Sequence, residues 1–274
     1  IAIVALGFAL VYNTTKIFHI AYAVLYTFAP YIFFTFHTNH GLNFGFAAIL
    51  AIISTVLLSM IIELVVYQPL QRKKSSLNQV LISSIGVMII VTNLLALLYG
   101  NETKMINPGI SGSLLIGNVL ITNNQIIQVS VSLFLIILFF LFLKYSKFGL
   151  VTRALRDDEY LSKVFAVNIR GLRLLVFGLS GLFAAIGGLL VAYDVGIDPY
   201  VGMPMLLNAF VALIIGGAGK FYTPVIGAFV IGILQSLTIW QFSANWCEAI
   251  TFVLLICFLI FRPQGLAGEL QREV

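Results

Sequence analysis

The residues from 125 to 143 read QIIQVSVSLFLIILFFLFL and carry no charged side chain. A second apolar run, LRLLVFGLSGLFAAIGGLLVA from 172 to 192, has the same character and contains a single arginine. The strands of an outer-membrane barrel alternate polar and apolar residues, and neither run shows this alternation. Because a helix crosses the hydrocarbon core with about 20 residues, both runs predict membrane-spanning helices.

The composition of the whole chain also indicates a lipid environment. Of its 274 residues, 61% are hydrophobic and 9% are charged, whereas a soluble domain is about half apolar and a quarter charged. Further apolar stretches lie at 1–12, 17–36, 44–67, 79–99, 205–217, 223–240 and 247–261. We therefore expect an all-α polytopic membrane protein, a single domain over residues 1–274 with about 8–9 transmembrane or re-entrant helices.

The basic residues predict the orientation of the chain. All but two of the 15 Lys and Arg residues fall in or beside segments 68–78 and 144–171, or in the last connection and the tail. By the positive-inside rule these segments face the cytoplasm. In the opposite loops, 37–43, 100–124 and 193–204, Lys104 is the only Lys or Arg residue. Topology thus explains the basic charge, and we expect no nucleic acid as a partner.

Two places interrupt the spanning pattern. The segment before Gly216 is shorter than a membrane crossing, and Gly216–Lys220 then turns the chain into the next apolar run. Near the start, Asn13–Lys16 separates two apolar runs, and Pro30 follows as a second weak point. Broken helices in transporters often surround a cavity, but a tight turn packed against its neighbours explains the same pattern. Both alternatives stay open at this point.

The sequence carries no catalytic signature. The glycine-rich string Gly216–Lys220 differs from a phosphate loop, because Ile214 stands at the first glycine position and Phe221 follows the lysine. Cys247 and Cys257 lie in one apolar run, where packing is their expected role. We therefore expect a protein that is not an enzyme, with no catalytic, cofactor-binding or metal-binding residue.

Ionisable residues inside the apolar runs are few. Glu63 and Glu248 lie near the ends of their segments, so neither stands at the middle of the bilayer, where a proton relay is expected. We interpret Glu63 as an anchor at an interface. His19 lies within an apolar segment, where it lines a pathway or forms part of a hydrogen-bonded core.

The most polar stretch runs from Gly149 to Gly171. Residues Thr152 to Phe165 can form an amphipathic helix, with Leu155, Leu161 and Val164 among its apolar contacts. Such a helix on the cytoplasmic face can dock in a groove of a soluble partner. A solvated loop held by its own ion pairs is the alternative.

At this stretch the sequence resembles the membrane permeases of ABC importers of the branched-chain amino-acid and urea/amide type. Their cytoplasmic motif, Gly-Arg-Ala-x-Arg-Ala-x-x-x-Asp followed by Gly-Ile/Val-Asn, is matched here at Gly149, Arg153, Ala154, Asp158, Val167 and Asn168. Leu150, Val151 and Ala166 depart from it. Other family motifs follow in family order at Glu63–Leu70, Leu81–Gly86, Asp198–Gly202, Asn208–Phe210, Gly216–Gly219 and Arg262–Leu266.

The resemblance implies an ABC importer permease fold and a set of partners. Two permease subunits form the pore, the second one a related but different chain. Two cytoplasmic ATPase subunits hydrolyse ATP, and an extracytoplasmic protein delivers the substrate. The segment 144–171 is then the cytoplasmic coupling loop. Its implied ATPase-coupling residues are Arg153, Arg156, Asp157, Asp158, Leu161, Phe165 and Asn168.

The resemblance further implies transport by alternating access across the bacterial inner membrane. The candidate substrate-pathway residues are His19, Tyr22, Ser83, Ser84, Asn93 and Asn208. Residues 19–24 read HIAYAV where the family has Asn-Phe-Ala-His-Gly-Glu, and Asn208 replaces a family lysine. A branched-chain amino acid is the expected substrate, with urea or an amide as the alternative. An ATP-independent secondary transporter or channel remains a further alternative.

Overall fold

The computed structural model describes residues 1–106, 112–116, 119–157, 168–217, 219–262 and 264–266. Its helices are α1 (Ala2–Thr15), α2 (Tyr22–Phe34), η1 (Thr35–Asn39), α3 (Phe44–Ile62), η2 (Glu63–Tyr67), α4 (Gln68–Arg72), α5 (Leu77–Tyr99), α6 (Asn123–Tyr145), α7 (Lys147–Asp157), α9 (Ile169–Val195), α10 (Gly202–Gly216), α11 (Thr223–Gln241), η3 (Ala244–Trp246) and α12 (Cys247–Phe261). Two short strands, β1 (Ser113–Ile116) and β2 (Val119–Thr122), complete the described elements.

The predicted helical membrane fold is confirmed. Within the described residues, six helical stretches are long and apolar enough to span a membrane, at Phe44–Arg72, Leu77–Tyr99, Asn123–Tyr145, Ile169–Val195, Thr223–Gln241 and Ala244–Phe261. The apolar helices α1, α2 and α10 are shorter. Together these elements agree with the predicted set of transmembrane and re-entrant helices.

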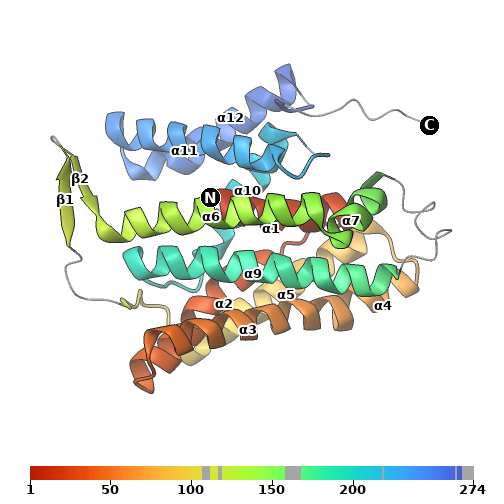
Figure 1. Cartoon of the computed structure of the whole chain (residues 1–274), viewed down its shortest axis with the longest axis horizontal. Helices are drawn as coiled ribbons and strands as arrows, with labels where there is room; N and C mark the ends of the chain where they lie inside the picture. The colour runs from red at the N-terminus through yellow and green to blue at the C-terminus, as the bar shows by residue number, and fades with distance from the viewer. Residues whose placement is uncertain (107–111, 117–118, 158–167, 218, 263, 267–274) are drawn as a thin grey trace.

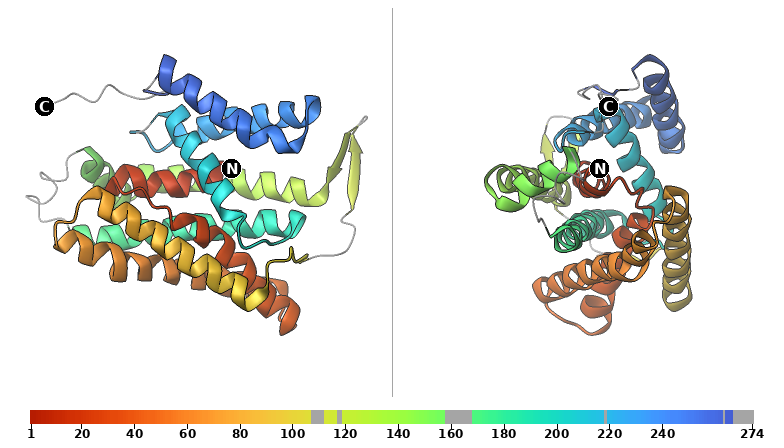
Figure 2. Two further views of the ribbon diagram at one scale, coloured as in Figure 1. Left: turned by 180° about the vertical axis from the view of Figure 1, so that it is seen from behind. Right: turned by 90° about the vertical axis from the view of Figure 1, so that its right-hand side faces the viewer.

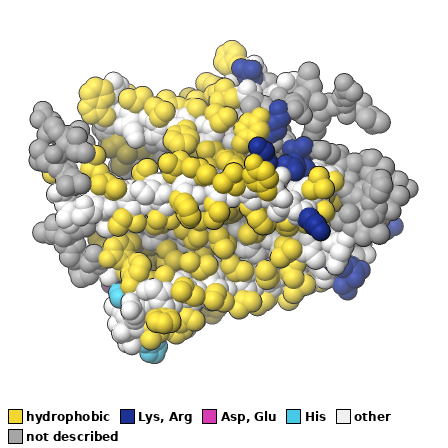
Figure 3. Space-filling view, viewed as in Figure 1, with side chains coloured by type: hydrophobic (Ala, Val, Ile, Leu, Met, Phe, Trp, Pro, Cys, Tyr) yellow, Lys and Arg dark blue, Asp and Glu magenta, His cyan; other side chains and the backbone are white. Residues whose placement is uncertain are grey.

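The long helices lie side by side, with the β1–β2 hairpin at one end of the bundle and α7 at the other (Figure 1). Lys and Arg side chains gather at the α7 end, whereas apolar side chains cover the flank between the two ends (Figure 3). Cytoplasmic loops of membrane proteins carry such an excess of Lys and Arg. We therefore take the α7 end as cytoplasmic and the hairpin end as external.

The centre of the bundle is formed by α1 and α2. Every side chain from Ile3 to Val11 is buried, because α9, α10 and α11 pack around α1. In turn, α2 packs against α3, α9 and α10. With 14 residues α1 is shorter than a membrane crossing, so the backbone groups at its ends need protein partners, which agrees with this central position.

The first break in the helices is a packed turn. α1 ends at Thr15, Lys16 takes a left-handed conformation with φ 57°, and α2 begins only at Tyr22, five residues after the start expected for this segment. The amide of Ala21 donates a hydrogen bond to the Ser84 hydroxyl of α5 at 2.9 Å. The amide of Ile17 donates to the Thr15 hydroxyl at 3.3 Å. These bonds satisfy backbone groups that the break frees, which favours the packed turn over a cavity.

The external loop 100–124 contains more regular structure than the short turns expected there. β1 and β2 pair antiparallel, with Ser113 opposite Thr122. Thr122 also starts α6, since its hydroxyl accepts a hydrogen bond from the amide of Gln125 at 3.3 Å while the Gln125 side chain bonds back. This reciprocal capping box ends the strand and begins the helix within one residue.

Candidate translocation and coupling sites

A pocket of about 230 Å³ opens in the external half of the molecule, between α2, α5 and the start of α10. Its lining mixes apolar with uncharged polar side chains, namely Ala23, Thr27, Met88, Ile89, Thr92, Asn93, Pro199, Tyr200, Gly202 and Met203. Ligand pockets in proteins are commonly apolar with a few well-placed polar groups. This pocket can therefore hold a small solute that has both polar and apolar parts.

The helices fix the polar groups of the pocket in different ways. The Asn93 amide donates a hydrogen bond to the carbonyl oxygen of Ile89 at 2.8 Å, one turn earlier on α5. Thr27 is buried and donates to the Val24 carbonyl oxygen at 3.1 Å. Both side chains are anchored to their own helix. Asn93 also keeps its carbonyl oxygen as a hydrogen-bond acceptor.

A second polar cluster lies on the other side of α10. The amide nitrogen of Gln235 in α11 lies 3.0 Å from the side-chain oxygen of Asn208 and 3.0 Å from the hydroxyl of Thr251 in α12. Asn208 and Thr251 share a small recess with Glu248. Of the predicted pathway residues, Asn208 therefore lies next to polar partners at a helix junction.

Three other predicted pathway residues are fully buried. His19 Nδ1 lies 2.7 Å from the Tyr67 hydroxyl, which lies 2.7 Å from the hydroxyl of Ser84. Tyr22 donates to the Val4 carbonyl oxygen at 2.9 Å. These contacts join the break between α1 and α2 to η2 and α5. Ser83 points elsewhere and donates to the Gln79 carbonyl oxygen on its own helix at 2.9 Å.

The structure thus places only Asn93 of the predicted pathway residues in the external pocket. Sequence reasoning missed Thr27, Thr92 and Tyr200. Tyr200 carried a usable signal, because it belongs to the Asp198–Gly202 motif that supported the family resemblance. Thr27 and Thr92 carry no such signal, since isolated threonines in apolar helices commonly bond their own backbone.

The predicted coupling segment begins as a helix at the cytoplasmic end. α7 contains Arg153 and Arg156 and ends at Asp157, whose side chain lies outside the described part of the structure. Asp158, Leu161 and Phe165 also lie outside the described residues. Of the helix predicted over 152–165, the structure describes residues 152–157, and these are helical.

Asn168 and Arg156 make contacts within the chain. The Asn168 side chain accepts a hydrogen bond from the amide of Gly171 at 3.1 Å and so caps the start of α9. The Arg156 guanidinium donates to the carbonyl oxygen of Gly219 in the turn between α10 and α11. Arg156 thus joins α7 to the turn after α10, whereas the contact of Asn168 is local to the start of α9.

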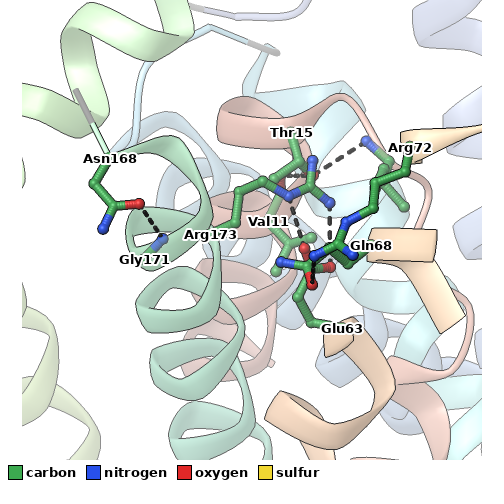
Figure 4. A network of polar contacts seen from close by, with 9 residues as sticks. Val11, Thr15, Glu63, Gln68, Arg72, Asn168, Gly171 and Arg173 are labelled. Carbon is green, nitrogen blue, oxygen red and sulfur yellow. Dashed lines mark hydrogen bonds and ion pairs between the residues drawn. The ribbon is translucent and has the colours of Figure 1, made fainter. Parts of the chain in front are cut away.

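A buried ion pair near the cytoplasmic end was not predicted. Arg173 of α9 points toward Glu63 at the start of η2 (Figure 4) and places two nitrogens on its two carboxylate oxygens, at 2.7 and 3.1 Å. The sequence held a signal for this pair, because both charges lie within apolar runs. The contact joins Glu63 to a neighbouring helix, whereas the sequence had led us to interpret Glu63 as an anchor at an interface.

Within the described residues, no group of three or more His, Cys, Asp and Glu side chains could hold a metal ion. A helical bundle with membrane-length helices, a small pocket of mixed polar and apolar lining near one end and a basic helix at the other agrees with a membrane transport protein. Residues 1–259 match the family described as the permease component of branched-chain amino acid transport systems, and the chain belongs to this family.

Curated relatives match almost the whole chain or, in one case given below, half of it. The high-affinity branched-chain amino acid permease LivH of Escherichia coli K12 is 26% identical over 99% of this chain and 92% of its own length. BraD of Pseudomonas aeruginosa, named in the same way, is 27% identical over the same shares. The probable branched-chain amino acid permease LivM of Methanocaldococcus jannaschii is 28% identical over 50% of this chain and 42% of its own length. No solved structure matches the chain.

Proposed function

We propose that this chain is the permease subunit of an ATP-driven importer that moves branched-chain amino acids across the bacterial inner membrane by alternating access. The observation that carries this proposal is the family match over residues 1–259, together with full-length relatives named as branched-chain amino acid permeases. The predicted resemblance to this family is therefore confirmed, while the substrate and the energy source belong to the proposal.

The chemistry of the external pocket suits such a substrate. Met88, Ile89 and Met203 offer apolar contacts for a branched side chain, and the Asn93 and Thr92 side chains offer hydrogen bonds for polar ends. Urea has no apolar part and would leave most of this lining without a contact. We therefore favour a branched-chain amino acid over urea.

The second permease subunit covers the face on which α10 crosses between α12 and α5, as seen from behind (Figure 2, left). Asn93 is exposed on α5, and Glu248 of α12 is exposed as well. Polar side chains inside a membrane are costly against lipid, so they face protein or a water-filled space. A related permease on this face encloses the pocket between the two subunits.

The two ATPase subunits dock on the coupling helices of the two permeases, and in this chain segment 144–171 makes the contact, with Arg153 and the residues that follow it. ATP hydrolysis belongs to these subunits, since the glycine-rich string of this chain differs from a phosphate loop. An external binding protein delivers substrate at the hairpin end. In this scheme the permease itself supplies the pathway and the conformational change.

Two experiments test the proposal. In cells with the complete system, unlabelled leucine, isoleucine and valine should each compete with uptake of labelled leucine, while urea and acetamide should not. Competition by urea alone would contradict the substrate assignment.

Affinity purification in mild detergent should recover two ATPase subunits and a second permease with this chain. Recovery of the chain as a lone polypeptide would contradict the assigned partners.

A further inference from the structure

The turn between α10 and α11 occupies a central place at the cytoplasmic end. Gly217 and Gly219 take positive φ values of 100° and 132°, which only glycine adopts without strain. The Thr223 hydroxyl at the start of α11 donates to the Lys220 carbonyl oxygen at 2.9 Å. Lys220 of this turn is therefore bonded to the first residue of α11.

The end of α1 holds this turn from one side. Asn13 is fully buried, and its side-chain oxygen accepts a hydrogen bond from the Gly219 amide at 3.2 Å. Its side-chain nitrogen lies 3.5 Å from the carbonyl oxygen of Lys220. The Asn13 side chain thus contacts backbone groups of two consecutive residues of the turn.

The coupling helix α7 holds the same turn through Arg156. The guanidinium donates to the carbonyl oxygen of Gly219, the residue whose amide bonds to Asn13. It also lies 5.8 Å from the centre of the Phe221 ring, a cation–π distance. A charged donor makes the first of these contacts stronger than a neutral hydrogen bond.

The other end of α10 forms part of the external pocket. Tyr200, Gly202 and Met203 line it, and Gly202 lies so close to α2 that an added Cβ would stand 2.1 Å from the Ala23 carbonyl oxygen. The backbones of α10 and α2 are therefore in direct contact at the pocket. A helix is stiff over this length, so displacement of one end of α10 moves the other.

We propose that Arg156 is a positioning residue that joins the coupling helix α7 to α10 through Gly219, Lys220 and Phe221, which lie between α10 and α11. Movement of α7 then shifts α10 and changes the wall of the external pocket at Met203. This inference rests on the proposed function, in which ATPase subunits move α7. Arg156 acts through the turn and does not touch the substrate.

The test uses the complete complex with its ATPases, second permease and binding protein in proteoliposomes. Arg156→Gln keeps a polar side chain but removes the charge, and Lys73→Gln makes the same type of change at an exposed position outside segment 144–171. The first readout is the amount of substrate imported per ATP hydrolysed. The second is the rate at which a Met203→Cys variant reacts with a membrane-impermeant thiol reagent, with and without ATP, after Cys247→Ser and Cys257→Ser.

For Arg156→Gln we expect intact assembly, continued ATP hydrolysis and about a tenfold lower import per ATP, as for loss of a hydrogen bond to a charged group. The ATP-dependent difference in labelling at position 203 should disappear. Lys73→Gln should keep both properties. The inference would be overturned if the Arg156→Gln complex had the same import per ATP and the same ATP-dependent labelling difference as the unaltered complex.

A second variant approaches the turn from its other side. If Arg156→Gln does not assemble, Asn13→Leu removes the opposite contacts, and lower import per ATP supports the inference while an unchanged value overturns it. Failure of the proposed function is recognised separately. In that case the unaltered complex itself shows no ATP-dependent import. If only the inference fails, the unaltered complex imports substrate with ATP, and the Arg156→Gln variant imports the same amount per ATP.

Discussion

The guanidinium of Arg173 donates two hydrogen bonds to the carboxylate of Glu63, from Nε to Oε1 at 2.7 Å and from Nη2 to Oε2 at 3.1 Å. The two side chains are 9% and 1% exposed. The pair connects α9 with η2, which follows α3 near the cytoplasmic end. Paired geometry of this kind fixes both the distance and the angle between two helices.

Removing one partner should therefore destabilise the chain more than removing both. Glu63→Gln or Arg173→Met leaves one buried charge without its partner, at a cost of about 3–5 kcal/mol. The double variant should recover much of this loss. Thermal unfolding in detergent measures the effect, with Arg170→Met, an exposed arginine of the same helix, as the control. Single variants as stable as this control would contradict the prediction.

The buried hydroxyl of Tyr67 links His19 to Ser84. Tyr67→Phe keeps the ring but removes the hydroxyl, so both partners lose a hydrogen bond inside the protein. We expect a loss of about 1–3 kcal/mol in unfolding free energy. Tyr145→Phe changes an exposed hydroxyl and should leave stability unchanged. Equal thermal stability of the two variants would show that the buried link is unimportant.

Gly188 of α9 provides a close approach to α2. A Cβ at this position would stand 2.1 Å from the Tyr26 carbonyl oxygen, whereas at Gly232 of α11 nothing lies within 4 Å. Gly188→Ala should therefore force the helices apart and cost about 1–3 kcal/mol. Gly232→Ala is the matched control and should be neutral or stabilising. The prediction fails if both alanine variants unfold at the same temperature.

Asn93 is the predicted pathway residue that reaches the external pocket. Asn93→Leu removes its hydrogen-bonding groups, so KM for leucine uptake should rise about three- to tenfold. Asn78→Leu makes the same change at an exposed position in the first turn of α5 and should leave KM unaltered. An unchanged KM in Asn93→Leu would remove this side chain from the pathway.

Periodicity and charge placement predicted the general architecture. The apolar runs at 125–143 and 172–192 lie within α6 and α9, and the Lys and Arg residues gather at one end of the bundle. These features depend on local sequence and on the surrounding lipid, which act on each segment separately. The family motifs predicted the family, which the match over residues 1–259 confirmed.

The individual contacts of the sites were harder to predict, because they join residues far apart in the sequence. Glu63 meets Arg173 across 110 positions, and the side chain of Asn13 meets Lys220 across 207. Periodicity says which face of a helix is apolar but does not say which neighbour covers it. The sequence therefore did not show that His19 and Ser84 are linked through Tyr67 beside the break between α1 and α2.

The central claim is tested most directly by uptake of labelled leucine into proteoliposomes that contain the chain, its second permease, the ATPases and the binding protein. With ATP available to the ATPases, leucine should accumulate, and replacing ATP with a non-hydrolysable analogue should abolish uptake. Collapse of ion gradients should have no effect. Uptake by this chain alone, driven by an ion gradient without ATP, would contradict the account.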